Sequence, residues 1–170
     1  MLARSATIFK WVLYALAGLV WAAVQSALLQ RLTVWGVIPF LYPLIAALPA
    51  TFEGPAAGTV YALSWGVLCD LLLPSPLPCF YTLILPFVGL SAGLLSRSLI
   101  PAGYLCSAAS ALPAYLLTGL FHCIVLWAQG HPAWGAALSV TIRELCVSLL
   151  WSLPMTWLFR RVYLRVHADD

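Results

Sequence analysis

Charge is scarce in this chain. Only 8% of its 170 residues are charged, with eight Lys and Arg and five Asp and Glu residues, whereas soluble domains carry about 25% charged residues. A soluble protein of this size cannot cover its surface with so few polar groups. Hydrophobic residues make up 64% of the chain, and the mean hydropathy is +1.00. The composition therefore excludes a soluble globular domain and predicts a protein embedded in the lipid bilayer.

The sequence also lacks the usual motifs of catalytic and cofactor sites. It has no glycine-rich phosphate loop, no haem motif and no basic patch with interleaved aromatic residues. The cysteines form no C-x-x-C pair and have no histidine at metal-ligand spacing, so we expect small apolar fillers: Cys69, Cys79, Cys106, Cys123 and Cys146. A disulfide between Cys69 and Cys79 stays open. We predict no metal, no cofactor and no nucleic-acid partner.

Six apolar stretches have about the length of 20 residues that a membrane-crossing helix needs. Charged residues and turns rich in Gly and Pro separate them, and the connections are short. The predicted fold is one all-α domain over residues 1–170 with six transmembrane helices, at residues 8–29, 36–52, 54–73, 79–100, 104–128 and 137–159. The boundary at Glu53 is the weakest, and a single bent segment replacing the second and third helices is the alternative.

Lys and Arg residues are distributed unevenly between the two sides of this bundle. With both termini in the cytoplasm, the outer side carries only Arg31 and Arg143. The cytoplasmic side carries six: Arg4, Lys10, Arg97, Arg160, Arg161 and Arg165. This asymmetry obeys the positive-inside rule. An even number of crossings is required to bring both basic termini to one side, so charge and hydropathy predict the same topology.

Small residues recur at every fourth position of the third stretch. In lipid, small residues at this spacing let helix backbones approach closely. The ladder ends at an acid and consists of Gly54, Gly58, Ala62, Gly66 and then Asp70. Further small residues at this spacing are Gly18, Ala22 and Ser26 in the first stretch and Gly89 and Gly93 in the fourth. We predict helix packing at these positions, including contact with a partner protein.

Asp70 is an acid within a predicted membrane helix. An ionised carboxylate there costs roughly 2.5–3.5 kcal/mol on insertion scales, and such residues are usually functional. Arg143 lies about 9 Å below the outer end of the sixth stretch, at 1.5 Å per residue, and its side chain can extend outward. We predict an Asp70–Arg143 pair, with Arg31 as the second candidate. The alternative is a hydrated Asp70, with Arg143 bound to Glu144 or to a lipid phosphate.

Residues 89–93, Gly-Leu-Ser-Ala-Gly, match the G-x-S-x-G pattern of serine hydrolases. A catalytic base must lie within about 3 Å of the serine hydroxyl. Ser91 lies about 18 Å from the outer end of its stretch and His122 about 9 Å from the outer end of the next one. The two side chains are therefore expected at different depths. The pattern also requires a strand-to-helix turn, whereas residues 89–93 lie in the middle of a predicted helix. We therefore predict no catalytic residues and a hydrogen bond from Ser91 to its own helix; an intramembrane protease is the weakest alternative.

Several motifs in the first half of the chain follow one another in a familiar order. They are Gln-Ser-Ala-Leu-Leu at 25–29, Trp-Gly-Val-Ile-Pro-Phe-Leu at 35–41, Gly54 and Gly58, and Trp-Gly-Val-Leu-Cys-Asp-Leu-Leu at 65–72. In this combination the chain resembles the rod shape-determining protein MreD family of bacteria. The length of the chain, its six predicted helices and its predicted cytoplasmic termini also match this family over the whole chain. The positions that match the family are Gln25, Pro39, Gly58, Gly66 and Asp70.

The resemblance implies a non-enzymatic component of the bacterial cell-shape and elongation complex in the cell (inner) membrane. MreD-like proteins bind the scaffold protein MreC. They act with the actin-like MreB filament and with the peptidoglycan polymerase and transpeptidase of the rod complex. The expected role is an adaptor that holds an MreC-like partner and helps to organise peptidoglycan synthesis.

The alternative is a substrate-binding membrane subunit of an energy-coupling-factor vitamin transporter, whose six-helix fold is similar to that of MreD. Such a protein needs an outer cavity with convergent polar groups. The candidates for this cavity are Asp70, His122, Trp134, Arg143 and Glu144.

Overall fold

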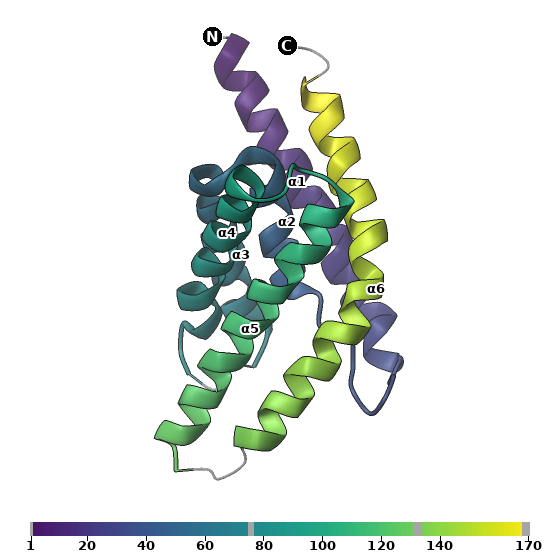
Figure 1. The fold of residues 1–170 in the computed structure, drawn as a ribbon. Helices are drawn as coiled ribbons and strands as arrows, with labels where there is room; N and C mark the ends of the chain where they lie inside the picture. The colour runs from purple at the N-terminus through teal and green to yellow at the C-terminus, as the bar shows by residue number, and fades with distance from the viewer. Residues whose placement is uncertain (1, 75–76, 131–133, 168–170) are drawn as a thin grey trace.

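The computed structural model describes residues 2–74, 77–130 and 134–167 (Figure 1). Within these residues the chain is all-α and contains no named strand, which confirms the predicted class. The helices are α1 (Leu2–Ala27), the short 3₁₀-helix η1 (Leu29–Arg31), α2 (Tyr42–Glu53), α3 (Pro55–Leu72), α4 (Phe80–Ser98), α5 (Tyr104–Ala128) and α6 (Trp134–His167).

Five helical segments in the described part of the chain are long and apolar enough to cross a membrane. They are α1 together with η1, and α3, α4, α5 and α6. Large apolar side chains lie exposed on each of these helices, among them Leu105, which is 79% exposed. A soluble monomer rarely exposes contiguous apolar surface on this scale. The chain therefore has the helical composition and the surface of a multi-pass membrane protein.

The predicted helix over residues 36–52 is wrong in its extent. Gly36 has a φ of 74°, and Pro39 lacks an N–H and disfavours helical backbone in the residue before it. Residues 38–41 therefore lie outside any helix, and α2 begins only at Tyr42. Its 12 residues extend about 18 Å at 1.5 Å per residue, less than the hydrocarbon thickness of about 30 Å.

Gly54 separates α2 from α3. Its φ of 91° lies in the left-handed region that glycine adopts without steric cost. Pro55 then begins α3, at a position where proline needs no hydrogen-bond partner for its nitrogen. The structure thus contains two helices here, and the alternative of a single bent segment is wrong.

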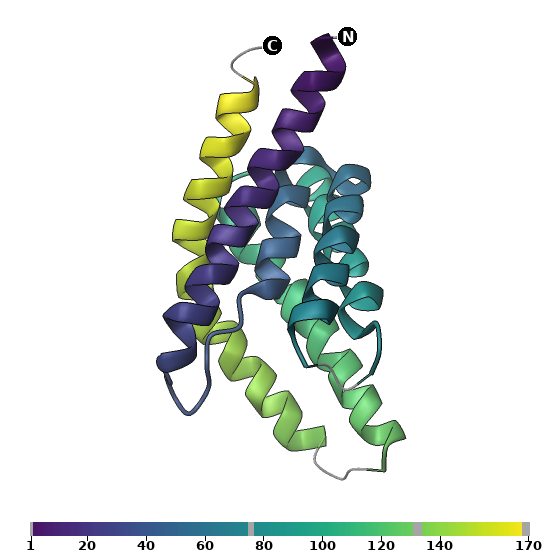
Figure 2. The same cartoon turned by 180° about the vertical axis from the view of Figure 1, so that it is seen from behind.

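The short helix α2 forms the centre of the bundle (Figures 1 and 2). It contacts all of the other α-helices, and ten of its residues are buried. The start of α1 and the end of α6 lie at one end of the bundle, here called the termini end (Figure 1). The α1–α2 connection lies at the opposite end (Figure 1). Helix α6 continues eight residues past its predicted end at Phe159, to His167, so the basic cluster that follows Phe159 is helical.

Candidate functional site

The small-residue ladder of α3 is occupied by contacts inside the bundle. A Cβ atom added to Gly58 would collide with the Cβ and Cα of Ala50 in α2. A Cβ added to Gly66 would lie 2.7 Å from the carbonyl oxygen of Tyr81 in α4. The packing role predicted for these glycines is confirmed. The expectation that the ladder is also available to a partner protein is wrong for these positions.

The glycines of α4 complete the same interface. A Cβ added to Gly89 would lie 2.8 Å from the Cβ of Ala62, and one added to Gly93 would lie 2.5 Å from the Cα of Pro55. Both neighbours belong to α3. The predicted packing pair is therefore confirmed, and it joins α4 to α3.

Ser91 lies between these two glycines and donates a hydrogen bond to the Val88 carbonyl of its own helix, at 2.9 Å, as predicted. We expect Ser91→Ala to change the free energy of unfolding by only about 0.6 kcal/mol, the average for a side-chain hydrogen bond in a membrane bundle. Unfolding in detergent and a growth assay would check this. Complete loss of function in a stably inserted Ser91→Ala protein would restore the catalytic interpretation.

Asp70 binds the first turn of α4. Its Oδ1 accepts a hydrogen bond from the Tyr81 N–H at 2.9 Å. Its Oδ2 accepts bonds from the Thr82 N–H at 2.8 Å and from the Thr82 hydroxyl at 2.6 Å. The first N–H groups of a helix have no partner within the helix, and a negative charge there interacts favourably with the helix dipole. Through these hydrogen bonds Asp70 links the end of α3 to the start of α4.

The predicted pair between Asp70 and Arg143 is wrong. Among the described residues, neither takes part in an ion pair, and Arg143 is exposed. The alternative partners, Arg31 for Asp70 and Glu144 for Arg143, are not paired there either. The physical reason is that the N–H groups of α4 lie directly at the end of α3 and occupy both oxygens of the carboxylate.

We therefore expect Asp70→Asn and Arg143→Gln to act additively on stability. Asp70→Asn places an NH₂ group against a backbone donor and should cost about 1–2 kcal/mol, as for other lost helix caps. Arg143→Gln should stay within about 0.5 kcal/mol. A double-mutant cycle on unfolding in detergent measures both. A coupling energy well above about 0.5 kcal/mol would contradict this assignment.

Lys10 and Glu53 form an ion pair on the termini side of the bundle. The Lys10 Nζ lies 2.5 Å from Glu53 Oε2, and the Tyr14 hydroxyl donates to Glu53 Oε1 at 3.0 Å. The side chain of Glu53 is only 7% exposed. This contact is not predicted above, because Lys10 contributes there only to the topology and Glu53 only marks a helix boundary. The predicted topology places both residues on the cytoplasmic side, and an acid in a membrane needs a partner. Their shared location could therefore have indicated this contact.

Gln25 holds the non-helical segment 38–41 from the side of α1. Its Nε2 donates to the Pro39 carbonyl at 2.5 Å, and its Oε1 accepts from the Leu41 N–H at 3.1 Å. Gln25 is buried. Two residues that carry the family resemblance, Gln25 and Pro39, are thus in direct contact, which no spacing in the sequence indicates.

The peptide groups of Phe40 are held from the other side of the bundle. The Phe40 N–H donates to the Ser148 hydroxyl of α6 at 3.2 Å, and the Tyr115 hydroxyl of α5 donates to the Phe40 carbonyl. Non-helical backbone at membrane depth is tolerated where protein satisfies its polar groups or where it lines a cavity. Side chains of three helices therefore fix this segment inside the bundle.

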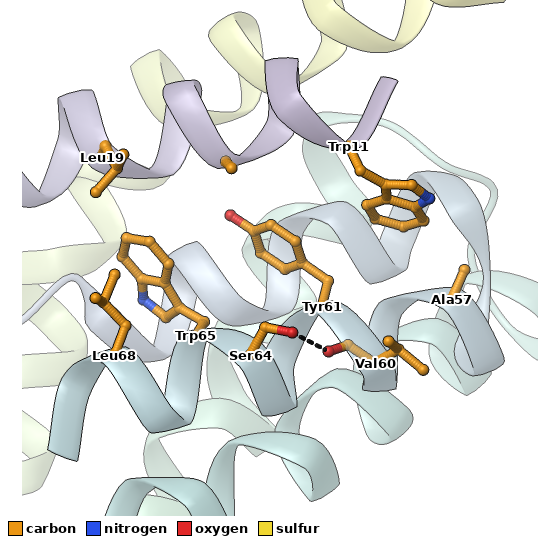
Figure 3. A pocket seen from close by; sticks show the side chains of 9 residues that line it. Trp11, Leu19, Ala57, Val60, Tyr61, Ser64, Trp65 and Leu68 are labelled. Carbon is orange, nitrogen blue, oxygen red and sulfur yellow. Dashed lines mark hydrogen bonds between the residues drawn. The ribbon is translucent and has the colours of Figure 1, made fainter. Parts of the chain in front are cut away.

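A lateral groove of about 720 Å³ lies between α1 and α3 (Figure 3). The rings of Tyr61 and Trp65 project from α3 toward α1 (Figure 3), and the Tyr61 hydroxyl donates to the Tyr14 carbonyl at 3.3 Å. The residues that line the groove are almost wholly apolar: Trp11, Ala15, Leu19, Ala57, Val60, Tyr61, Ser64, Trp65 and Leu68. Both of its walls are helices long enough to cross a membrane.

Two further pockets meet at Phe40 and Glu144. The larger, of about 520 Å³, lies beside the α1–α2 connection and is lined by Gln25, Gln30, residues 36–40, Tyr42, Leu73, Val140 and Glu144. The smaller, of about 40 Å³, is lined by Phe40, Phe80, Tyr81, Thr118, Gly119, His122, Thr141 and Glu144. Of the polar residues predicted for an outer cavity, only His122 and Glu144 line these two pockets; Asp70, Trp134 and Arg143 do not.

Comparison with known proteins gave no match among protein-family models, curated proteins or solved structures. Within the described residues, no group of three or more His, Cys, Asp and Glu side chains is placed to hold a metal ion. The five cysteines are free thiols. The candidate sites of this chain are therefore the groove between α1 and α3 and the two pockets that meet at Glu144.

Proposed function

We propose that this chain is a non-enzymatic membrane adaptor of the MreD type, which holds the membrane helix of an MreC-like scaffold protein. In this role it belongs to the bacterial elongation complex of the cell (inner) membrane, together with MreB and the peptidoglycan polymerase and transpeptidase. The motifs in the first half of the chain carry the resemblance. The structural observation that supports the adaptor role is the apolar groove between α1 and α3.

In this proposal the chain crosses the bilayer six times. The second crossing combines α2, about 18 Å long, with the four residues 38–41, which extend up to about 13 Å at 3.3 Å per residue. Together they approach the hydrocarbon thickness of about 30 Å. The basic end of α6 lies at the termini end (Figure 1), which supports a cytoplasmic location of that end. A reporter fused after Asp170 is expected to be active only in the cytoplasm, and periplasmic activity would contradict this topology.

The groove has the properties of a helix-packing surface. On α3, Ala57, Tyr61, Ser64 and Leu68 recur at helical spacing along it, over about 16 Å at 1.5 Å per residue. Lipid tails are as apolar as a helix surface, so helices associate in membranes through close packing, which small side chains permit. Small residues line both walls of the groove, Ala15 on α1 and Ala57 and Ser64 on α3. One apolar helix of a partner is the occupant that we propose.

Filling the groove tests this function. Ser64 lines the groove and is exposed, so Ser64→Trp should block a partner helix without disturbing the core. We expect copurification of an MreC-like partner to fall by about tenfold, equivalent to about 1.4 kcal/mol, at an unchanged amount of inserted protein. Leu112→Trp, on the exposed face of α5, is the matched control and should bind normally. Normal binding by Ser64→Trp would contradict the proposal.

The pocket beside the α1–α2 connection favours one alternative function. A substrate-binding subunit of an energy-coupling-factor transporter would bind its vitamin in such a pocket, whose volume of about 520 Å³ is typical of small-molecule sites. Copurification distinguishes the two functions. An ATPase-bearing transporter module would support the transporter subunit, and MreC with rod-complex proteins would support the adaptor.

A further inference from the structure

We propose that the two pockets meeting at Glu144 form a binding site for an organic ammonium group, with the Glu144 carboxylate as its counter-ion. The ligand class is a small amine with an apolar or aromatic body. This site is separate from the groove between α1 and α3, and it goes beyond the adaptor function proposed above.

Glu144 differs from the other acids that the structure describes. Glu53 binds Lys10 and Tyr14, and Asp70 binds the first turn of α4. Glu144 forms no hydrogen bond or ion pair within the described part of the chain, and it is only partly exposed. It lies ten residues into α6, about 15 Å from the start of that helix. An acid at such a position is usually paired, and its partner marks a functional site.

The walls around Glu144 suit a cation. Among the described residues, His122 is the only basic side chain in the lining, and no Lys or Arg residue lines either pocket. No permanent positive charge of the lining therefore repels a cation or competes for the carboxylate. Aromatic rings form a continuous cluster there, with ring centroids 5.4 Å apart for Phe40 and Tyr42 and 6.2 Å apart for Phe40 and Tyr81. Aromatic faces attract ammonium groups within about 6 Å, most strongly where water is excluded. Charge and ring placement therefore favour an amine over an anion.

The site is also preformed. The peptide groups of Phe40, which both pockets share, are fixed by Ser148 and Tyr115, and Gln25 fixes the neighbouring residues. The larger pocket has the volume of a small-molecule site. The smaller pocket of about 40 Å³ has room for one water molecule, whose share of liquid volume is about 30 Å³. A ligand body in the larger pocket would thus place its ammonium group beside Glu144.

A pair of probes that differ in charge tests this site. The full chain is reconstituted in phosphatidylglycerol nanodiscs and titrated by calorimetry with 2-phenylethylamine and with neutral 2-phenylethanol, and empty discs are subtracted. We expect the amine to bind at least about tenfold more tightly than the alcohol. Glu144→Gln should remove this preference. Arg165→Gln, which also changes the charge by one unit but lies at the termini end, should leave it intact.

Two sources of the ammonium group can be distinguished in the same assay. If the natural ligand is a lipid headgroup, phosphatidylethanolamine in the discs should compete with 2-phenylethylamine, and Glu144→Gln should abolish the competition. If the ligand is a soluble amine, the added lipid should have no effect. Equal affinity for the amine and the alcohol, no measurable binding of the amine, or an unchanged preference in Glu144→Gln would each overturn the proposal. If Glu144→Gln fails to insert, the two probes on the unmodified chain decide the question.

Discussion

Gly58→Ala is expected to destabilise the bundle by about 3 kcal/mol or more, at the upper end of the cost of overpacking a core. The added methyl group would collide with the backbone Cα of Ala50 as well as with its Cβ, so no change of rotamer relieves the contact. Helix α2 cannot move away, because ten of its residues are buried and it contacts every other α-helix. Unfolding in mild detergent, followed by circular dichroism, measures the effect.

Gly135→Ala is the matched control for this prediction. Gly135 is also a helical glycine, but a Cβ added there meets no atom of the described residues within 4 Å. Alanine favours helix over glycine by about 1 kcal/mol, so this variant should be as stable as the unmodified chain or more so. If Gly58→Ala unfolds under the same conditions as Gly135→Ala, the close approach of α2 and α3 is wrong.

The close packing of Gly58 and Gly66 determines which substitutions can test partner binding. The small-residue ladder of α3 predicts that Gly58→Leu and Gly66→Leu weaken association with an MreC-like partner while the protein still inserts. Both glycines lie against backbone atoms of the same chain, so bulky substitutions there should disrupt the fold first. A lost partner would then report unfolding and not a lost contact. Ser64→Trp avoids this ambiguity, because Ser64 is exposed in the groove.

Hydropathy predicted the long helices with exposed apolar surface and failed at α2, which is buried among the other helices. Helices α3, α4 and α5 begin and end within two residues of the prediction, because Gly and Pro turns terminate their apolar runs sharply. Helices α1 and α6 are longer than predicted, since a helix can continue past the bilayer where charged residues are tolerated. The apolar run over residues 36–52 predicted a full crossing, but its hydrophobicity serves burial among other helices.

The sequence predicted several residues of the candidate sites but not the contacts that these residues make. The predicted helix bounds place Asp70 close to the end of α3, where it lies, but the charges in the sequence suggest only cations as its partners. The backbone N–H groups at the start of α4, which bind it, have no signature in a count of charges. The contact of Gln25 with Pro39 depends on the rotation of α1 about its axis, which hydropathy leaves undetermined. Tyr115 and Ser148 gave no signal at all, because each resembles many other residues in this chain.

Gln25→Leu is the second substitution with a large expected effect. It removes the partners of two backbone groups at once, the Pro39 carbonyl and the Leu41 N–H. A buried polar group without a partner costs about 1–3 kcal/mol, and the hydrocarbon region offers no water in exchange. For the two groups together we therefore expect the free energy of unfolding to fall by about 2–6 kcal/mol. Gln30→Leu is the control, since Gln30 is exposed and should change stability by less than about 0.5 kcal/mol.

Gln25→Glu separates the two hydrogen bonds. An ionised carboxylate can accept from the Leu41 N–H but cannot donate to the Pro39 carbonyl, and its charge is buried at a position that is only 3% exposed. A protonated carboxyl can do both. The stability of this variant should therefore rise more steeply as the pH falls than that of the unmodified chain. If Gln25→Leu is as stable as Gln30→Leu, and the stability of Gln25→Glu changes with pH no more than that of the unmodified chain, then these two hydrogen bonds do not hold segment 38–41 in place, and the walls of the Glu144 pockets are not preformed.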